Sequence, residues 1–225
     1  MVSGSAIDGR GVFIVLEGID GCGSTTQAAL LAEGLRERGH AVTATAEPSS
    51  GAVGRLIRQA LSGSDPTVAF DWATMALLFA ADRLHHVQEV IAPALQAGHV
   101  VVCDRYDLSS VAYQSATAVE REAMVPWIQS LNRFACRPDL TLVLDIDADL
   151  AEQRRRARGG PEEIFEKRDL QRRLADLYAK AESLVPGDRV VHIDAALAAA
   201  AVQRRVRGAL QSLAGLENLT LSSGG

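Results

Sequence analysis

The sequence predicts an α/β fold in which a five-stranded parallel sheet is flanked by helices. Five short apolar runs, VFIVLE, AVTAT, HVVVCD, LTLVLDI and RVVHI, are each followed by a segment with helical periodicity. The runs lack polar alternation, which favours strands that are covered on both faces. Alternation of such strands with helices is typical of a parallel sheet between two helical layers.

Length and composition indicate how the chain is organised. With 225 residues, of which 48% are hydrophobic, the chain can form one domain with a sizeable core. No repeat and no Pro/Gly/Ser-rich linker divides it. We therefore expect a single domain over residues 1–225, with a core of about residues 11–215 and loose ends at about 1–10 and 216–225.

Charge, cysteine content and hydropathy argue against several classes of protein. A net charge of −5 argues against generic nucleic-acid binding. Cys22, Cys103 and Cys136 are isolated and odd in number, which fits neither a disulfide framework nor a zinc site. No apolar run is long enough to cross a membrane, and residues 1–10 lack the pattern of a signal peptide. We expect a soluble cytoplasmic protein without nucleic-acid or membrane partners.

The first expected strand, at residues 12–17, leads into a glycine-rich segment that is typical of phosphate-binding loops. This segment, GIDGCGSTTQ, fits the pattern G-x-x-x-x-G-K-[ST] except that Ser24 takes the lysine position. Its glycines let the backbone curl, so that several N–H groups and the start of the next helix converge on one anion. The residues expected to cradle the phosphates are Gly18, Gly21, Cys22, Gly23, Ser24, Thr25 and Thr26.

The remaining elements follow in the same alternation. A helix is expected from about Thr25 to Arg38, with Gly39 as its C-cap. Strands are expected at 41–45, 99–104, 140–146 and 189–193, and a helix at about 71–87. Ligands of such sheets sit beyond the carboxyl ends of the strands. Four of the five strand ends carry acidic residues, which are Glu17, Asp104, Asp145 or Asp147, and Asp194.

Further stretches resemble the thymidylate kinases, a family of the P-loop nucleoside-monophosphate kinase group. In order, they are EPSSGAVGRLIR, LLFAADRLHHV, VVCDRYDLSSVAYQ, RPDLTLVLDID and RRRARGG, and with the loop they cover about residues 12–195. LLFAADR and VVCDRY are the discriminating stretches, because a phosphate loop alone occurs in many NTPases. The resemblance implies transfer of phosphate from ATP to dTMP with Mg²⁺ as cofactor, a homodimer, and a lid at about residues 150–168.

The resemblance also assigns roles on the acceptor side. Phe79 matches the aromatic that stacks on thymine, and Arg83 matches the arginine that contacts the base. A flat apolar ring is suited to the face of a base, and a guanidinium can donate to its carbonyl oxygens. Taken alone, Phe79 would indicate only a core aromatic. Arg105 matches the arginine that holds the acceptor phosphate. Asp20 matches the acidic residue close to the acceptor's sugar hydroxyl and the reacting phosphates. Residues that match positions around the base, the sugar or a neighbouring turn are Glu47, Pro48, Ser110, Tyr113 and Gln114.

Two residues are expected on the metal side. Thr25 would offer its hydroxyl to Mg²⁺, which bridges the outer phosphates. Asp104 matches a carboxylate near the metal, and its alternative role is a cap at the end of a strand.

The turn at Glu47 and Pro48 contains a cis-proline in some relatives; an ordinary trans turn is the alternative.

The chain departs from the family pattern on the ATP side. Besides Ser24, the turn Arg-Glu-Pro-Gly-Gly is changed, and in the lid Glu162 and Glu163 stand where many bacterial members carry an Asp-Arg pair. The changed residues of the turn are Ala46, Ser49 and Ser50. Two cationic contributions to the ATP side are therefore expected to be weak, whereas the acceptor side is complete.

Arginines of the lid helix are candidates to replace the missing cation. Arg154 and Arg158 lie four residues apart and are expected on one helix face, so they are the catalytic candidates. Basic residues in a last turn also simply complement the helix dipole, which accounts for at least two of the four arginines. The remaining candidates are Arg155, Arg156 and Arg168.

Two functions of different classes stay open from the sequence. One is an active thymidylate kinase, fast or slow, in which lid arginines and Mg²⁺ compensate for Ser24. The other is a catalytically impaired relative that binds nucleotide in a regulatory or binding role. A related kinase for another nucleotide would need a different base pocket. His85 and His86 are expected to cap or solvate their helix rather than to act as bases.

Overall fold

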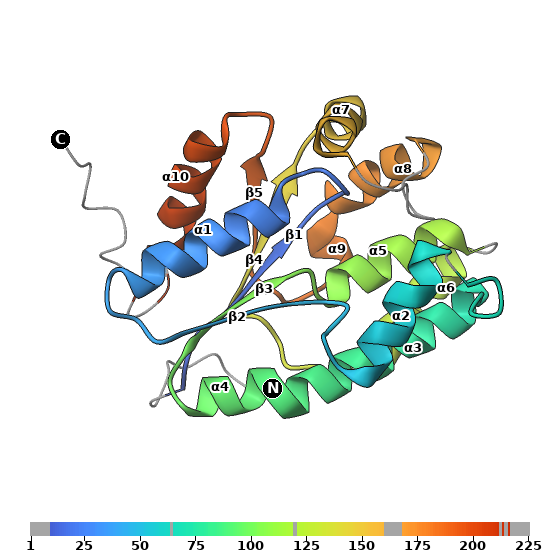
Figure 1. The fold of residues 1–225 in the computed structure, drawn as a ribbon, viewed down its shortest axis with the longest axis horizontal. Helices are drawn as coiled ribbons and strands as arrows, with labels where there is room; N and C mark the ends of the chain where they lie inside the picture. Colours follow the sequence, from blue (N-terminus) through green and yellow to red (C-terminus); the bar gives the residue numbers. More distant parts are fainter. Residues whose placement is uncertain are drawn as a thin grey trace.

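The computed structural model describes residues 10–63, 65–118, 121–159, 168–211, 213 and 216. Within these residues, five strands form one parallel sheet in the order β2-β3-β1-β4-β5 (Figure 1). This confirms the predicted fold class, and each strand lies within one residue of its expected bounds. The strands are β1 (Phe13–Glu17), β2 (Val42–Ala46), β3 (Val100–Asp104), β4 (Leu140–Asp145) and β5 (Val190–Asp194).

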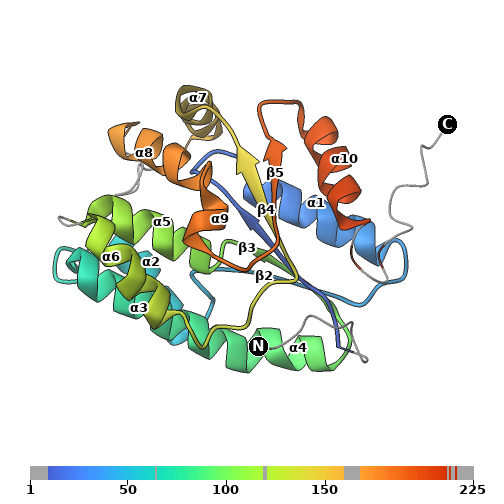
Figure 2. The same cartoon turned by 180° about the vertical axis from the view of Figure 1, so that it is seen from behind.

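Helices connect the strands and cover the sheet. Their bounds are α1 (Ser24–Arg36), α2 (Ala52–Ser62), α3 (Trp72–His86), α4 (Ala92–Gln96), α5 (Asp107–Thr117), α6 (Arg121–Leu131), α7 (Ala148–Arg158), α8 (Arg168–Tyr178), α9 (Ala181–Leu184) and α10 (Ala199–Leu210). A short π-helix, η1 (Val87–Ile91), joins α3 to α4 and was not foreseen. Figures 1 and 2 show α1 and α10 on one side of the sheet and α3, α4 and α5 on the other.

The core has an apolar layer on each side of the sheet. Alternate residues of a strand point to opposite faces, so Ile14 and Leu16 belong to the cluster that includes α1 and α10. Phe13 and Val15 belong to the cluster that includes η1 and α4. The central strands are buried almost throughout, but β2 and β5 are partly exposed. Full coverage on both faces was therefore wrong for these two strands, which lie at the two edges of the sheet.

The topology brings three chain segments together at the carboxyl edge of the sheet. β1 lies in the centre, with β3 on one side and β4 on the other. The backbone N–H of Arg105 donates to Leu16 at 2.8 Å, and that of Glu47 donates to Asp104 at 3.0 Å. The segments that follow β1, β2 and β3 therefore lie side by side, where a parallel sheet places its ligands.

Some expectations concern residues outside those described. Glu162 and Glu163 of the predicted lid lie outside them, as do nearly all residues of the expected loose ends. The single domain therefore stays a prediction. Among the described helices, none is both long enough and apolar enough to span a bilayer.

Candidate active site

The segment between β1 and α1 lines a pocket at the carboxyl edge of the sheet. Gly21 and Gly23 have φ angles of 92° and 96°, which side chains rarely adopt. A Cβ atom on Gly21 would lie 2.4 Å from the carbonyl oxygen of Ala151, whereas one on Gly23 would meet nothing within 4 Å. This open backbone at the start of a helix is suited to an anion. The pocket is lined by Asp20, Gly21, Gly23, Ser24, Thr25, Thr26, Arg105, Arg154, Arg155 and Arg158.

Gly18 and Cys22 support this loop and do not line its pocket. Gly18 has a φ of 151°, and a Cβ atom there would lie 2.8 Å from the Cys22 sulfur. Burial raises the pKa of the Cys22 thiol to about 11, so the side chain is a neutral packing group. Gly18 and Cys22 therefore contribute to the expected phosphate site only through the conformation of the loop backbone.

Thr25 and Asp104 meet at the edge of the same pocket. The Thr25 hydroxyl donates to Oδ2 of Asp104 at 2.5 Å, so the first turn of α1 reaches the end of β3. Oδ1 of Asp104 is buried without a hydrogen-bond partner among the described residues. A buried carboxylate oxygen without a partner, next to a hydroxyl, offers the hard oxygen ligands that a divalent cation prefers.

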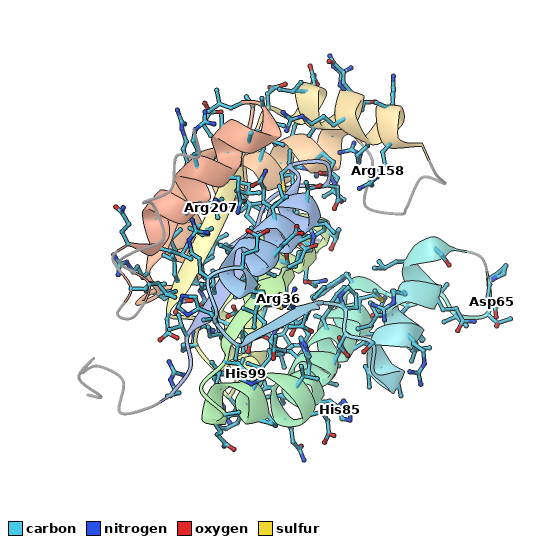
Figure 3. All side chains as sticks on the ribbon, turned by 60° about the vertical axis from the view of Figure 1, so that its left-hand side comes forward. Arg36, Asp65, His85, His99, Arg158 and Arg207 are labelled. Atoms are coloured by element: carbon cyan, nitrogen blue, oxygen red, sulfur yellow. The ribbon has the colours of Figure 1, made fainter. Side chains whose placement is uncertain are left out.

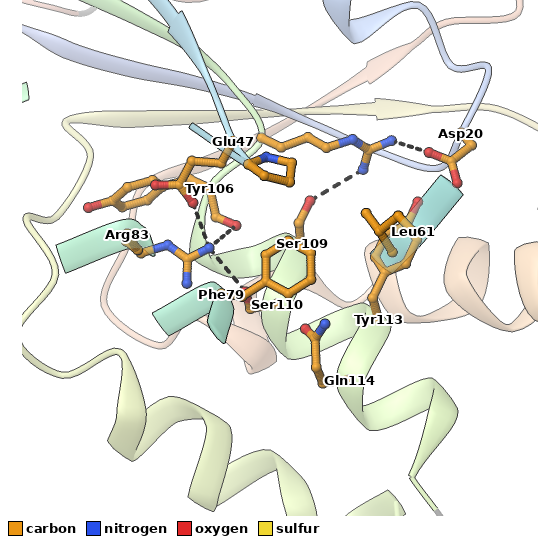
Figure 4. A pocket seen from close by; sticks show the side chains of 12 residues that line it. Asp20, Glu47, Leu61, Phe79, Arg83, Tyr106, Ser109, Ser110, Tyr113 and Gln114 are labelled. Carbon is orange, nitrogen blue, oxygen red and sulfur yellow. Dashed lines mark hydrogen bonds and ion pairs between the residues drawn. The ribbon is translucent and has the colours of Figure 1, made fainter. Parts of the chain in front are cut away.

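A second pocket lies beside the first and contains the predicted acceptor residues (Figure 4). Phe79 of α3 contributes a partly buried ring, and Gln114 of α5 is 1% exposed with its Oε1 unpartnered among the described residues. Burial raises the pKa of the Tyr113 hydroxyl well above its usual value, so Tyr113 is neutral. The residues that line this pocket are Asp20, Glu47, Pro48, Leu61, Phe79, Arg83, Arg105, Tyr106, Ser109, Ser110, Tyr113 and Gln114.

Arg83 lies deep in this pocket and already has several protein partners. Its guanidinium donates to Glu47 at 2.6 Å, to Asn132 at 2.5 Å and to the Ser110 hydroxyl at 3.0 Å. Its Nε has no partner among the described residues. Glu47 precedes a cis peptide bond to Pro48, so the expected turn occurs here in its cis form. The ion pair therefore fixes the deep end of the pocket.

Asp20 and Arg105 stand in the wall that the two pockets share. The Arg105 guanidinium donates to Oδ1 of Asp20 at 2.6 Å and to the Gly18 carbonyl at 2.8 Å. It also lies over the Tyr113 ring, 5.4 Å from its centre. Arg105 has a φ of 68°, which is uncommon for a residue other than glycine and is found often at functional sites. A cation and a carboxylate thus separate two adjoining pockets.

Three of the four arginines near the end of α7 line the glycine-loop pocket. Arg154 donates to the carbonyl of Ala195 at 2.8 Å, and Arg155 donates to that of Asp20 at 2.5 Å. Arg158, labelled in Figure 3, forms no hydrogen bond or ion pair with another described residue. Arg156 pairs with Glu152 and does not line the pocket. The expected shared face of Arg154 and Arg158 holds.

Arg168 does not take part in either pocket. It pairs with Asp149 at 2.8 Å and approaches Glu152 at 3.6 Å, both on α7. It therefore joins α8 to α7 through two acidic partners.

Sequence reasoning missed several buried polar supports of the site. Glu17 is 0% exposed and accepts bonds from the Tyr106 N–H at 2.8 Å, the Ser109 hydroxyl at 2.6 Å and the Tyr178 hydroxyl at 3.2 Å. Burial raises the pKa of its carboxyl group, against these hydrogen bonds and the Arg105 charge. Only its place at a strand end signalled a role.

Two further supports lie on α3. Asp82 is 1% exposed and accepts two bonds of 2.6 Å from Ser49, one from its backbone N–H and one from its hydroxyl. His86 is also 1% exposed and bonds to Thr45 at 2.7 Å and to Glu47 at 3.1 Å. The expectation that His86 caps or solvates its helix was therefore wrong, whereas His85 is exposed (Figure 3).

The comparisons with known proteins agree with this arrangement. A family model described as Thymidylate kinase matches residues 16–206. A probable thymidylate kinase of Pyrococcus abyssi is 44% identical over 189 residues, which span 81% of this chain and 88% of that protein. One of Methanococcus vannielii is 45% identical over 172 residues, which span 76% of this chain and 78% of that protein. The resemblance seen in the sequence is confirmed, and the chain belongs to the thymidylate kinase family.

Proposed function

We propose that this chain transfers the γ-phosphate of ATP to dTMP, giving ADP and dTDP. The observation that carries the proposal is the Asp20–Arg105 pair in the wall common to both pockets. Transfer between two nucleotides needs their phosphates in line and close, with positive charge where the negative charge shifts. A guanidinium that borders both pockets supplies that charge at the point of transfer.

The glycine-loop pocket is the proposed site of the ATP phosphates. Backbone N–H groups around Gly21 and Gly23 and the start of α1 would hold the outer phosphates. The γ-phosphorus exchanges its bond to the bridging oxygen of ATP for a bond to an oxygen of the acceptor phosphate. That oxygen is already ionised at neutral pH, so no strong general base is required. This fits a site whose polar groups bind and orient.

The second pocket is the proposed dTMP site. Phe79 would stack on the thymine ring, and Arg105 would hold the phosphate with its bidentate fork. The buried Tyr113 ring would leave no room for a 2′-hydroxyl, which favours deoxyribose. Arg83 and Gln114 would border the base. The Nε of Arg83 and the Oε1 of Gln114 have no partner among the described residues and offer one donor and one acceptor.

The proposed cofactor is Mg²⁺, and the side chains present fit it. Thr25 and Asp104 would hold the ion, since Mg²⁺ commonly takes a hydroxyl or carboxylate together with phosphates. When bound, it would neutralise negative charge on the phosphates. Among the described residues, no group of three or more His, Cys, Asp or Glu side chains is placed to hold a metal ion.

Three arginines support the active kinase over a protein that only binds nucleotide. The pocket around Ser24 contains Arg154, Arg155 and Arg158 in addition to Arg105. Arg154 and Arg155 are engaged by backbone carbonyls. We propose that Arg158 supplies part of the charge that a lysine at position 24 would have given.

A coupled assay with ATP, Mg²⁺ and dTMP tests the proposal, with Asp20→Ala as the control for contaminating host enzyme. We expect ADP release that depends on dTMP and is lost in the control. Equal rates with dUMP, dCMP or dGMP would instead indicate another acceptor. Binding of both nucleotides without turnover would favour the regulatory alternative. We also propose a homodimer in the cytoplasm.

A further inference from the structure

Helix α8 places two buried polar side chains against the Asp20–Arg105 pair. Gln171 and Tyr178 lie seven residues apart, and therefore on the same side of the helix, and are 0% and 2% exposed. The Gln171 amide donates to Oδ2 of Asp20 at 2.8 Å, and its carbonyl oxygen accepts the Asp20 backbone N–H at 3.1 Å. Arg105 donates to the other carboxylate oxygen, Oδ1. Both oxygens of Asp20 are thus held, one from each side.

These bonds fix both the backbone and the carboxylate of Asp20. The residue precedes Gly21 in a loop of glycines, where the chain itself restricts the side chain little. If Gln171 were removed, the carboxylate would keep Arg105 and the nearby Tyr113 hydroxyl, and it would lose the contact that also fixes the Asp20 backbone. Asp20 could then turn away or draw the guanidinium with it. Either change would displace the charge that borders both pockets.

Packing alone does not account for a glutamine at this position. The other buried residues on this side of α8 are Leu170, Leu174 and Tyr178. A leucine would fill a similar volume without two polar atoms that must be desolvated. The amide is therefore explained by the donor and the acceptor that Asp20 presents together.

We propose that Gln171 is a positioning residue for phosphoryl transfer, which orients the Asp20 carboxylate so that Arg105 stays between the two nucleotides. This inference rests on the proposed function. It assigns Gln171 no contact with either substrate, and its effect passes through Asp20.

The first test compares Gln171→Leu with the matched control Gln203→Leu. Gln203 is a 6% exposed glutamine on α10 whose amide atoms have no partner among the described residues. Support of a catalytic group is typically worth about 10- to 100-fold in activity, so kcat should fall by that factor in Gln171→Leu. The KM for ATP should change little, and Gln203→Leu should retain the unaltered kcat.

The second test replaces the amide by a titratable group in Gln171→Glu. The charged or titratable groups that face Asp20 are Arg105, Arg155 and Tyr113. While protonated, the introduced carboxyl group donates its O–H to Asp20 as the amide does. As pH rises it ionises, and two carboxylates repel each other. The kcat of Gln171→Glu should therefore approach the unaltered value at low pH and fall as pH increases.

The outcomes separate the two proposals. Equal kcat values for Gln171→Leu and Gln203→Leu would overturn the positioning role, as would a pH profile of Gln171→Glu parallel to that of the unaltered protein. An equal fall in Tm and kcat for both leucine variants would also overturn it, because the effect would then be general destabilisation. An unaltered protein that does not phosphorylate dTMP would overturn the proposed function itself and, with it, this role.

Discussion

At the scale of single residues, charge placement around the glycine loop decides how the site works without a lysine. Ser24 is 5% exposed and uncharged, so it can offer one hydrogen bond to a phosphate but no positive charge. Arg154, Arg155 and Arg158 of α7 line the same pocket. Holding the phosphates and stabilising the shifting charge are therefore divided between the loop backbone and another helix.

We predict that Ser24→Lys raises kcat for dTMP phosphorylation more than it tightens ATP binding. A well-placed donor to developing charge is worth roughly 10²- to 10³-fold, so the gain is bounded by that factor. Arg158→Ala should lower kcat in the unaltered protein and much less in the Ser24→Lys background. Steady-state kinetics and ATP calorimetry measure both effects. Arg156→Ala is the matched control, since Arg156 is 79% exposed on the same helix. Additive effects in the double variant would contradict a shared role.

Phe79→Ala should weaken dTMP binding. Stacking of a base on an aromatic side chain is worth about 1–3 kcal/mol, which corresponds to roughly 5- to 150-fold in Kd. Calorimetry with dTMP measures the loss, and Phe134→Ala is the control, because Phe134 is 70% exposed and outside the pocket. Binding that is indifferent to Phe79→Ala would remove the stacking role.

At the scale of elements, buried polar contacts fasten the connecting segments to the sheet. Glu17 at the end of β1 binds the N–H groups that precede and begin α5. Asp82 and Arg83 of α3 hold Ser49 and Glu47 of the turn after β2. Each contact joins segments far apart in sequence, so the pockets keep their shape only while these elements stay docked.

Glu47→Gln should strongly destabilise the fold. The Glu47–Arg83 pair has side chains only 3% and 1% exposed, and loss of one partner of a buried pair costs about 3–5 kcal/mol. For a chain of this length, that corresponds to a fall in Tm of roughly 5–20 °C. Asp149→Asn breaks an exposed pair with Arg168 and should leave Tm unchanged. If calorimetry gave similar Tm values for both variants, the buried Glu47–Arg83 pair would not stabilise the fold as predicted.

Ionisation of Glu17 should make the free energy of unfolding depend on pH. Burial raises its pKa in the folded state above the ordinary 4.5, so the folded protein binds this proton more tightly than the unfolded chain. This contribution is present at low pH and is lost as pH rises from the unfolded to the folded pKa. Relative to the unaltered protein, Glu17→Gln should therefore gain stability as pH increases through that window and then level off. Urea unfolding at a series of pH values measures the difference, and the opposite slope would contradict it.

At the scale of the whole molecule, one sheet edge collects groups from distant parts of the chain, and the outer surface offers an apolar face. Leu77 and Leu84 of α3 are 51% and 40% exposed and lie seven residues apart, so they share one side of the helix. Exposed apolar side chains on one face are typical of an interaction surface.

We predict that this face of α3 contributes to the proposed homodimer. Leu77→Glu combined with Leu84→Glu should convert the dimer to a monomer, because charge would be buried at the contact. Light scattering and sedimentation measure the mass, and circular dichroism checks that the fold is retained. Phe134→Glu is the control at another exposed apolar residue. A monomeric unaltered chain, or a dimer that survives the double change, would contradict the prediction.

The fold class, the glycine loop and the family can all be inferred from the amino-acid sequence. Continuous apolar runs indicate strands that are buried between helical layers, and a glycine-rich loop depends on residues that are adjacent in sequence. Both features can therefore be recognised without knowing the fold. Glu17 and Asp104 were visible only as acids at strand ends. Which groups they bind depends on β1 and β3 being neighbours, which their separation in the sequence does not reveal.

Which polar side chains are buried, and which groups they bind, depends on how distant segments of the chain pack together. His86 and Gln171 are polar residues on helices, and helical periodicity alone does not distinguish a solvated position from one that faces Glu47 or Asp20. Likewise, Arg154, Arg155 and Arg158 line the pocket only because α7 packs close to the glycine loop. Long-range docking sets these contacts, because a charged or polar side chain is buried only where a distant segment satisfies it.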